Sequence, residues 1–266
     1  MKNITDQRQW NLNKVKTEVL YGIHPVFEAL SAGRREIRQI FHAKDSSPHG
    51  RLQDVVLLAE KLNIPVKKIM QKELETFTGT KQHQNIGASV SRYPLVDLEG
   101  IIRKENKKSE DGFLLLLDNI IDPHNLGALV RTALCVGING IIITKDRSAA
   151  PTPAVSKVSA GALEHVYMAC VTNMVQAIKI LKKKEYWIAG TDIKAKTSLF
   201  ASSLAGPLAI AIGGEEKGLR PLVKKNCDFI VSIPQSVMIN SLNASASGAV
   251  VMYEAFRQRQ LKKSSK

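Results

Sequence analysis

Apolar and polar positions alternate in two successive runs along the chain, and each run predicts helices interleaved with strands. The first run occupies residues 17–95 and follows a polar, aperiodic stretch at 1–16, which we expect to form a flexible tail. This alternation predicts a small, compact α/β domain. Its expected elements are a short apolar stretch at 19–23, a helix from about Pro25, strands at 37–42, 64–69 and 86–90, and helices at 52–62 and 73–78.

A charged stretch at 96–111 separates the two runs, and we interpret it as a linker that a short helix can precede. The second run, at 112–262, has strands that are apolar throughout, as expected when helices cover both faces of a parallel sheet. The pattern alone predicts an open, Rossmann-like sheet. Its expected strands are 113–117, 140–144, 165–171, 187–191, 208–212 and 228–233, and its expected helices are 127–136, 154–162, 174–184, 219–226 and 242–261.

Two loops in the second run carry the features of a binding site. The strand at 208–212 breaks into a glycine-rich turn at 213–218, and the strand at 228–233 stops at Pro234 before the segment 240–245 enters a long helix. We expect these loops to end two neighbouring strands and to face each other across a pocket. Asn240 or Ser241 can cap the helix, whose free N–H groups suit an anion or polarised ligand atoms. Each loop alone is equally consistent with an ordinary turn between a strand and a capped helix.

The charge of the chain indicates an anionic partner. Lys and Arg number 38 against 24 Asp and Glu, for a formal net charge of +14 that is spread over both halves. Such a surface favours a polyanion, whereas an aromatic content of 5% argues against a protein that stacks single-stranded bases. A hydrophobic content of 44% is sufficient for a packed core.

Cysteine usage and the N-terminal sequence bear on the compartment. The three cysteines are far apart and surrounded by apolar residues, which favours a reducing compartment over a disulfide framework. No apolar run is long enough for a membrane helix, and the first residues lack the core of a signal peptide. We therefore expect a soluble cytoplasmic protein with no membrane partner.

Several common chemistries lack their motifs. The six histidines show no ligand spacing among themselves or with the cysteines, so we expect no metal site. Neither a dinucleotide fingerprint, a P-loop nor a nucleophile elbow is present. What remains is the segment 118–133, which follows a strand and places Arg131 one turn inside a helix on the side of Gly127. The alternative for Arg131 is a structural salt bridge with a carboxylate such as Glu164.

Three motifs in the second run resemble, in order and spacing, those of the SpoU/TrmH family of S-adenosylmethionine-dependent RNA ribose 2′-O-methyltransferases. The first is Pro-His-Asn-Leu-Gly at 123–127 followed by Arg131, the second is Gly213-x-Glu215-x-x-Gly218, and the third joins Ile-Pro at 233–234 to Ser-Leu-Asn-Ala-Ser at 241–245. Further segments at 21–30, 145–153 and 158–165 resemble the RlmB-like branch in particular, which methylates a guanosine in large-subunit (23S-type) rRNA. The resemblance covers nearly the whole chain.

The resemblance implies a C-terminal SPOUT methyltransferase domain with a trefoil knot, an exception to unknotted topology. It also implies that the chain works as a homodimer, and that residues 17–95 form a ribosomal-protein-like RNA-binding domain. Two residues depart from the family pattern: Gln235 replaces the usual Met and Val237 the usual Gly. Both lie in the loop expected to approach the cofactor.

By resemblance, five residues are expected to be catalytic. Arg131 would hold a backbone phosphate and stabilise the developing oxyanion. A guanidinium stays protonated at neutral pH and is a poor base, so the phosphate or a water would take the proton. Asn125 and Ser241 would orient the arginine and the ribose. Glu215 would balance Arg131 or contact the substrate, and Asn243 would hold the last loop against the first motif.

The same resemblance assigns S-adenosylmethionine to Gly213, Gly218 and the backbone of Ile233 and Leu242, since glycine allows the main chain to approach a ligand closely. Two alternatives remain open. One is a 2′-O-methyltransferase that acts on tRNA, and the other is a non-catalytic RNA-binding or ribosome-assembly protein with a degenerate knot.

Overall fold

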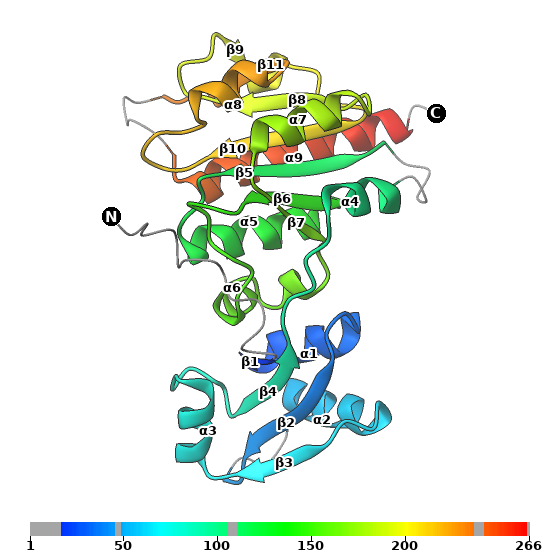
Figure 1. Ribbon diagram of the computed structural model, residues 1–266, viewed down its shortest axis with the longest axis vertical. Helices are drawn as coiled ribbons and strands as arrows, with labels where there is room; N and C mark the ends of the chain where they lie inside the picture. Colours follow the sequence, from blue (N-terminus) through cyan, green and yellow to red (C-terminus); the bar gives the residue numbers. More distant parts are fainter. Residues whose placement is uncertain (1–16, 46–48, 106–110, 237–241, 265–266) are drawn as a thin grey trace, which may run out of the picture. The chain divides into compact units, whose positions relative to one another are not determined.

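The computed structural model describes residues 17–45, 49–105, 111–236 and 242–264. The chain divides into two compact units, Met1–Tyr93 and Pro94–Lys266 (Figure 1). No helix within the described ranges is both long and apolar enough to cross a membrane.

The first unit is a four-stranded sheet with three helices. The strand order is β1-β4-β2-β3, in which β4 runs antiparallel to β1 and β2, and β2 runs parallel to β3. Its elements are β1 (Thr17–Tyr21), α1 (Ile23–Ala32), β2 (Ile37–Ala43), α2 (Arg51–Lys61), β3 (Val66–Ile69), α3 (Gln71–Thr78) and β4 (Ile86–Ser91). They agree with the predicted elements to within a few residues.

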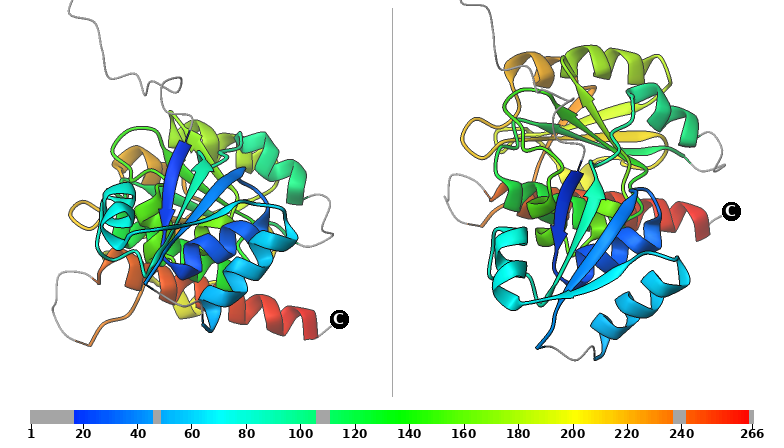
Figure 2. Two further views of the ribbon diagram at one scale, coloured as in Figure 1. Left: turned by 90° about the horizontal axis from the view of Figure 1, so that it is seen from below. Right: turned by 60° about the horizontal axis from the view of Figure 1, so that its bottom comes forward.

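Helices lie on both faces of this sheet (Figure 2). Ile40 of β2 packs in one apolar cluster with Val26 of α1 and Val55 of α2. The next residue along the strand, Phe41, contacts a separate cluster that contains Leu74 of α3. Because successive side chains of a strand point to opposite faces, α1 and α2 cover one face and α3 the other.

The second unit contains a seven-stranded sheet in the order β7-β6-β5-β10-β8-β11-β9, with every neighbouring pair parallel. The predicted α/β fold with a C-terminal parallel sheet is confirmed. The elements are α4 (Leu98–Glu105), β5 (Phe113–Asp118), α5 (Pro123–Cys135), β6 (Gly140–Thr144), α6 (Pro153–Val158), η1 (Ala162–Glu164), β7 (Met168–Val171), α7 (Met174–Lys182), β8 (Trp187–Thr191), β9 (Thr197–Ser198), η2 (Leu199–Ala201), β10 (Leu208–Gly213), α8 (Pro221–Asn226), β11 (Phe229–Ser232) and α9 (Ala244–Ser264).

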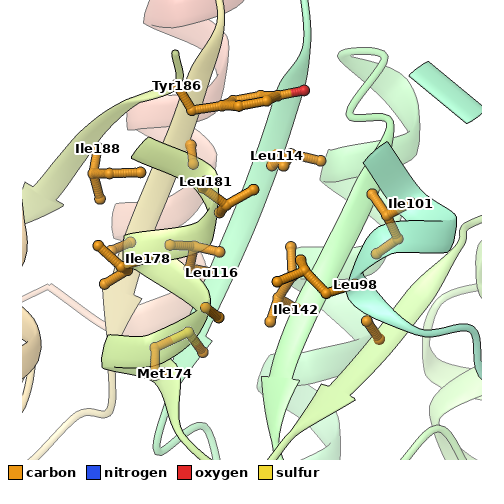
Figure 3. Packing of buried hydrophobic residues seen from close by; sticks show 14 of the residues in the cluster. Leu98, Ile101, Leu114, Leu116, Ile142, Met174, Ile178, Leu181, Tyr186 and Ile188 are labelled. Carbon is orange, nitrogen blue, oxygen red and sulfur yellow. The ribbon is translucent and has the colours of Figure 1, made fainter. Parts of the chain in front are cut away.

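The segment expected as a linker is partly folded into this core. Val96 bridges to Ala169 of β7, and α4 buries Leu98 and Ile101 against Ile142 in the apolar cluster shown in Figure 3. The reason lies in the sequence, because apolar residues recur at helical spacing between the charges. Residues 106–110 lie outside the described part of the chain.

Three further predictions differ from the structure. Strands β10 and β11 are not neighbours, because β8 lies between them. The helix expected at 154–162 ends at Val158, since Ala160 and Gly161 take left-handed backbone angles. Helix α5 begins at Pro123, four residues earlier than expected. The knot is expected to involve the C-terminal segment, whose residues 237–241 lie outside the described ranges.

Candidate active site

The first turn of α5 positions the first motif. The Asp122 carboxylate accepts hydrogen bonds from the backbone N–H groups of His124 (3.1 Å) and Asn125 (3.4 Å), and Pro123 occupies the first helical position. These contacts satisfy N–H groups that have no partner within the helix. They hold Asn125 near the end of β5, where the residue is buried and only 7% exposed.

Side chains of all three motifs meet at Asn125. Its Nδ2 donates to Glu215 Oε1 at 2.9 Å, and Asn243 Nδ2 donates to Asn125 Oδ1 at 3.0 Å and also to Glu215. The side-chain oxygen of Asn243, Oδ1, accepts hydrogen bonds from the backbone N–H groups of Ser245 (2.9 Å) and Ala246 (3.2 Å), so the residue caps α9. We call Asn125, Glu215 and Asn243 the amide–carboxylate cluster. It joins segments more than 100 residues apart at one point.

The turn at 213–218 depends on close backbone approach. A Cβ at Gly213 would overlap the backbone of Gly218 and Leu219, and a Cβ at Gly214 would overlap the carbonyl oxygen of Asn119. Gly214 and Gly218 pair across the turn, and Gly218 has a φ of 60°. Only glycine fits such positions without strain. The turn therefore lies against the end of β5 and presents Glu215 to the amide–carboxylate cluster.

A pocket of about 640 Å³ opens beside this turn. Its walls come from the carboxyl ends of β8, β10 and β11 and from the start of α9, where ligands bind in open parallel sheets. The predicted cofactor residues Gly213, Gly218, Ile233 and Leu242 all line it, and so does Gln235. Its size lies within the usual range for small-molecule sites. Val237 lies outside the described residues.

Two ion pairs at this edge of the sheet were missed by sequence reasoning. The first joins Asp118, which is 0% exposed at the end of β5, to Arg220 at the start of α8. The carboxylate accepts from Nε (2.8 Å), the second terminal nitrogen (2.6 Å) and the backbone N–H (2.9 Å) of Arg220. A buried carboxylate needs such partners, and this pair links the end of β5 to Arg220, shortly after the glycine turn at 213–218. An aspartate directly after a buried apolar strand was the available signal.

The second ion pair is in the pocket wall, where Asp192 Oδ2 lies 2.5 Å from Lys224 Nζ. Partial burial raises the pKa of Asp192, but hydrogen bonds from Lys224 and from the N–H of Lys194 outweigh burial, and the resulting pKa lies below its ordinary value. Asp192 is therefore a carboxylate at neutral pH.

Arg131 stands apart from this arrangement. Its side chain is exposed on α5, does not line the pocket, and has no hydrogen bond or ion pair with any residue that the structure describes. The alternative salt bridge with Glu164 is absent, because Glu164 is buried and accepts from Ser156 Oγ at 2.8 Å. Ser241, the remaining predicted catalytic residue, lies outside the described ranges. The roles of all five residues stay predictions.

The pocket wall offers no metal cluster. Within the described ranges, no group of three or more His, Cys, Asp or Glu side chains could hold a metal ion.

Comparisons with known proteins identify the family of the chain. The SpoU rRNA Methylase family matches residues 112–253, and a domain described as "RNA 2'-O ribose methyltransferase substrate binding" matches residues 19–96. The putative TrmH family tRNA/rRNA methyltransferase YacO of Bacillus subtilis is 36% identical over 91% of this chain and 96% of its own length. A Coxiella burnetii protein named 23S rRNA (guanosine-2'-O-)-methyltransferase RlmB is 36% identical over 94% and 98%.

Solved structures show the same fold. The SpoU methyltransferase AviRb from Streptomyces viridochromogenes, crystallised with AdoMet, superposes with a TM-score of 0.78 at 23% identity and covers 92% of each chain. An rRNA methyltransferase from Sinorhizobium meliloti gives a TM-score of 0.73 over 91% of this chain and 87% of its own. The predicted family is thus confirmed by sequence relatives along nearly the whole chain, and this protein belongs to the SpoU rRNA methylase family.

Proposed function

We propose that this protein transfers a methyl group from S-adenosylmethionine to the ribose 2′-OH of a guanosine in large-subunit (23S-type) rRNA. The observation that carries the proposal is the amide–carboxylate cluster, which joins the three motifs beside a pocket of cofactor size. The matches to relatives named RlmB cover more than nine-tenths of this chain and of each relative, which supports a guanosine in 23S rRNA as the target.

The pocket suits S-adenosylmethionine in shape and chemistry. Gly213 and Gly214 pack against protein backbone where a Cβ would overlap it, which fixes the path of the main chain that lines the pocket. Ile212, Ile233 and Leu242 supply apolar wall, and Asp192 and Lys224 add charged groups to the lining. When bound, the cofactor supplies an electrophilic methyl group on a sulfonium. This chain has to orient the ribose oxygen and stabilise the charge that develops on it.

Arg131 is placed to meet RNA. An exposed guanidinium with no partner in the described chain can bind a phosphate through two parallel hydrogen bonds, and it neutralises charge on the attacking oxygen. The Glu215 carboxylate is already engaged by two amide groups, so it acts as an anchor for Asn125 and Asn243 and does not pair with Arg131. A phosphate or water then takes the 2′-OH proton.

The first unit is the proposed RNA-binding domain. The match to a substrate-binding domain at 19–96 and the net charge of +14 support this role. RNA affinity should fall steeply with salt, because phosphate contacts release counterions. A chain that starts at Pro94, the first residue of the second unit, should therefore retain cofactor binding and lose much of its RNA affinity.

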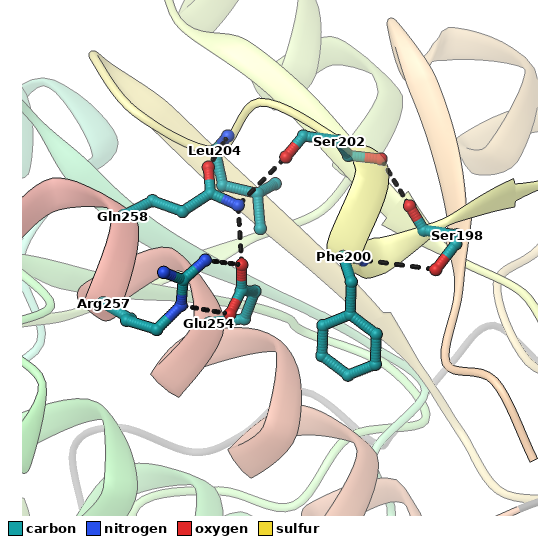
Figure 4. A network of polar contacts seen from close by, with 7 residues as sticks. All are labelled: Ser198, Phe200, Ser202, Leu204, Glu254, Arg257 and Gln258. Carbon is teal, nitrogen blue, oxygen red and sulfur yellow. Dashed lines mark hydrogen bonds and ion pairs between the residues drawn. The ribbon is translucent and has the colours of Figure 1, made fainter. Parts of the chain in front are cut away.

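We further propose that the enzyme works as a homodimer in the cytoplasm. An apolar groove of about 650 Å³ lies on the outer face of α9, lined by Phe200, Val250, Tyr253, Phe256 and Leu261. Contiguous exposed apolar surface of this kind favours a protein interface. Figure 4 shows that Glu254 accepts hydrogen bonds from Arg257 and Gln258, and that Gln258 bonds the backbone of Ser202 and Leu204, which ties α9 to the segment after η2.

Mapping 2′-O-methyl groups on 23S rRNA from cells that lack the protein tests the function. The expected result is the loss of one guanosine methylation, which returns with the wild-type gene and not with an inactive variant. Loss of a tRNA methylation instead would favour the alternative suggested by relatives named tRNA/rRNA methyltransferase. An unchanged set of methyl groups in both RNAs would favour a non-catalytic assembly protein.

A further inference from the structure

Asp192 is a charged residue in the pocket wall that no motif accounts for. It directly follows β8, the strand that separates β10 from β11, and its carboxylate is 23% exposed into a pocket lined also by Lys194, Lys217 and Lys224. We propose that the Asp192 carboxylate binds the ribose hydroxyl pair of the cofactor. The proposal rests on the proposed use of S-adenosylmethionine and assigns one part of that molecule to one residue.

The hydrogen-bonding state of Asp192 leaves it able to bind a ligand. Oδ1 accepts from the backbone N–H of Lys194 at 2.7 Å, and Oδ2 accepts from Lys224 at 2.5 Å. A carboxylate offers about four acceptor sites, so each oxygen retains capacity for one more donor. These two contacts also fix the orientation of the carboxylate before a ligand arrives, which lowers the entropy lost on binding.

The position of Asp192 favours the nucleoside part of the cofactor over its reacting methyl group. The proposed ribose of the RNA approaches the amide–carboxylate cluster, which contacts the end of β5 and the glycine turn after β10. Asp192 follows β8, on the other side of β10 from β5. A ligand that presents its methyl group at the cluster therefore extends its nucleoside toward β8 and β11.

Charge selects the hydroxyl pair over the ammonium group of the methionine part. Lys224 and Lys194 flank Asp192, so a second cation at this carboxylate would meet two like charges. A neutral hydroxyl pair donates hydrogen bonds without that repulsion. Acidic side chains also bind ribose hydroxyls in dinucleotide-binding folds.

A second ion pair in the same unit provides a matched control. Asp228 accepts from the backbone N–H of Ile188 at 2.8 Å and pairs with Lys182 at 2.7 Å, and its side chain is also 23% exposed. It does not line the pocket. Asp192→Ala and Asp228→Ala thus each remove one backbone hydrogen bond and one lysine ion pair, and only the first removes a carboxylate from the pocket. Asp192→Asn and Asp228→Asn form a milder pair.

The test measures binding of 5′-methylthioadenosine and of its 2′,3′-dideoxy analogue by calorimetry, without RNA. Both ligands lack the amino-acid part, so a contact with the ammonium group cannot contribute. Wild type and Asp228→Ala should prefer the ligand with hydroxyls by about tenfold or more, the scale of a hydrogen bond to a charged group. Asp192→Ala should lose about tenfold of that preference, with melting temperatures of the two variants alike.

Two results would overturn the assignment. One is a hydroxyl preference that Asp192→Ala leaves unchanged, which would make the ion pair a structural tie between β8 and α8. The other is an effect of Asp192→Ala on S-adenosylhomocysteine but not on 5′-methylthioadenosine, which would place the ammonium group at Asp192. Neither depends on methyl transfer, so failure of the proposed rRNA activity would be seen separately, as absent methylation with normal ligand binding.

Discussion

Two parts of the candidate site differ in how their side chains are held: the pocket side, at the amide–carboxylate cluster, and the proposed RNA side, at Arg131. Asn125, Glu215 and Asn243 hold one another beside the pocket, whereas Arg131, on the same helix as Asn125, has no hydrogen bond or ion pair with any described residue. Glycine packing and the buried Asp118–Arg220 pair further fix the pocket side. We infer that the chain preorganises the cofactor site and leaves Arg131 free to engage RNA.

The largest expected effect comes from removing the buried pair on the pocket side. Arg220→Ala leaves the fully buried Asp118 carboxylate without its guanidinium partner, and the expected loss of folding stability is about 3–5 kcal/mol. Denaturant unfolding measures it. Lys182→Ala, which breaks the more exposed pair with Asp228, should cost less than about 1 kcal/mol. Equal losses in the two variants would show that the Asp118 pair has no special structural role.

On the RNA side, Arg131→Ala should slow single-turnover methyl transfer by about a hundredfold or more, the scale for one positioned charged donor. Cofactor affinity and melting temperature should stay close to wild type, because the exposed side chain has no hydrogen bond or ion pair with any described residue. Arg131→Lys should not restore the rate, since an ammonium lacks the planar fork. Lys225→Ala removes an exposed positive charge elsewhere and should act weakly. A destabilised Arg131→Ala variant with a normal rate would reverse the assignment.

A smaller loss of stability is expected at Asn243, which both caps α9 and contacts Asn125 and Glu215. A comparison with a residue that only caps a helix distinguishes the two roles. Asn243→Ala loses both the cap of α9 and the contacts to Asn125 and Glu215, whereas Asn173→Ala loses only the cap of α7. Each should lower stability by about 1 kcal/mol. Only Asn243→Ala should also weaken cofactor binding and slow methyl transfer. If both variants keep the wild-type rate, the amide–carboxylate cluster has no part in the chemistry.

The smallest expected effect is a pH dependence at Asp192. Because its folded-state pKa lies below the ordinary value, the stabilisation by Lys224 is present above about pH 4 and is lost as the pH falls through the lower, folded-state pKa. The difference in melting temperature between wild type and Asp192→Asn should therefore shrink between pH 5 and strongly acid pH. A difference that is constant over this range would contradict the ion-pair contribution.

Local sequence patterns predicted most of the fold. Continuous apolar strands such as 113–117 and 208–212 could only be buried on both faces, and they form the centre of the parallel sheet. The stretch at 96–111 was interpreted as a linker that a short helix can precede, because the few apolar residues of α4 stand among charges. The order of strands could not be predicted, since no local pattern indicates that β8 pairs between β10 and β11.

The site was predictable only in part. The pocket residues Gly213, Gly218, Ile233 and Leu242 and the meeting of Asn125, Glu215 and Asn243 match the residues that the family resemblance singled out. Asp118 and Arg220 are 102 positions apart and have no motif, so their pairing appears only in three dimensions. The same holds for Asp192 and Lys224, 32 positions apart.

Cofactor binding by the full chain without RNA tests the preorganised pocket most directly. Calorimetry with S-adenosylmethionine, in buffer with a metal chelator, should give one cofactor per chain for wild type and the same affinity for Arg131→Ala. Binding that appears only after RNA is added, or that the chelator abolishes, would contradict a cofactor site that this chain assembles by itself.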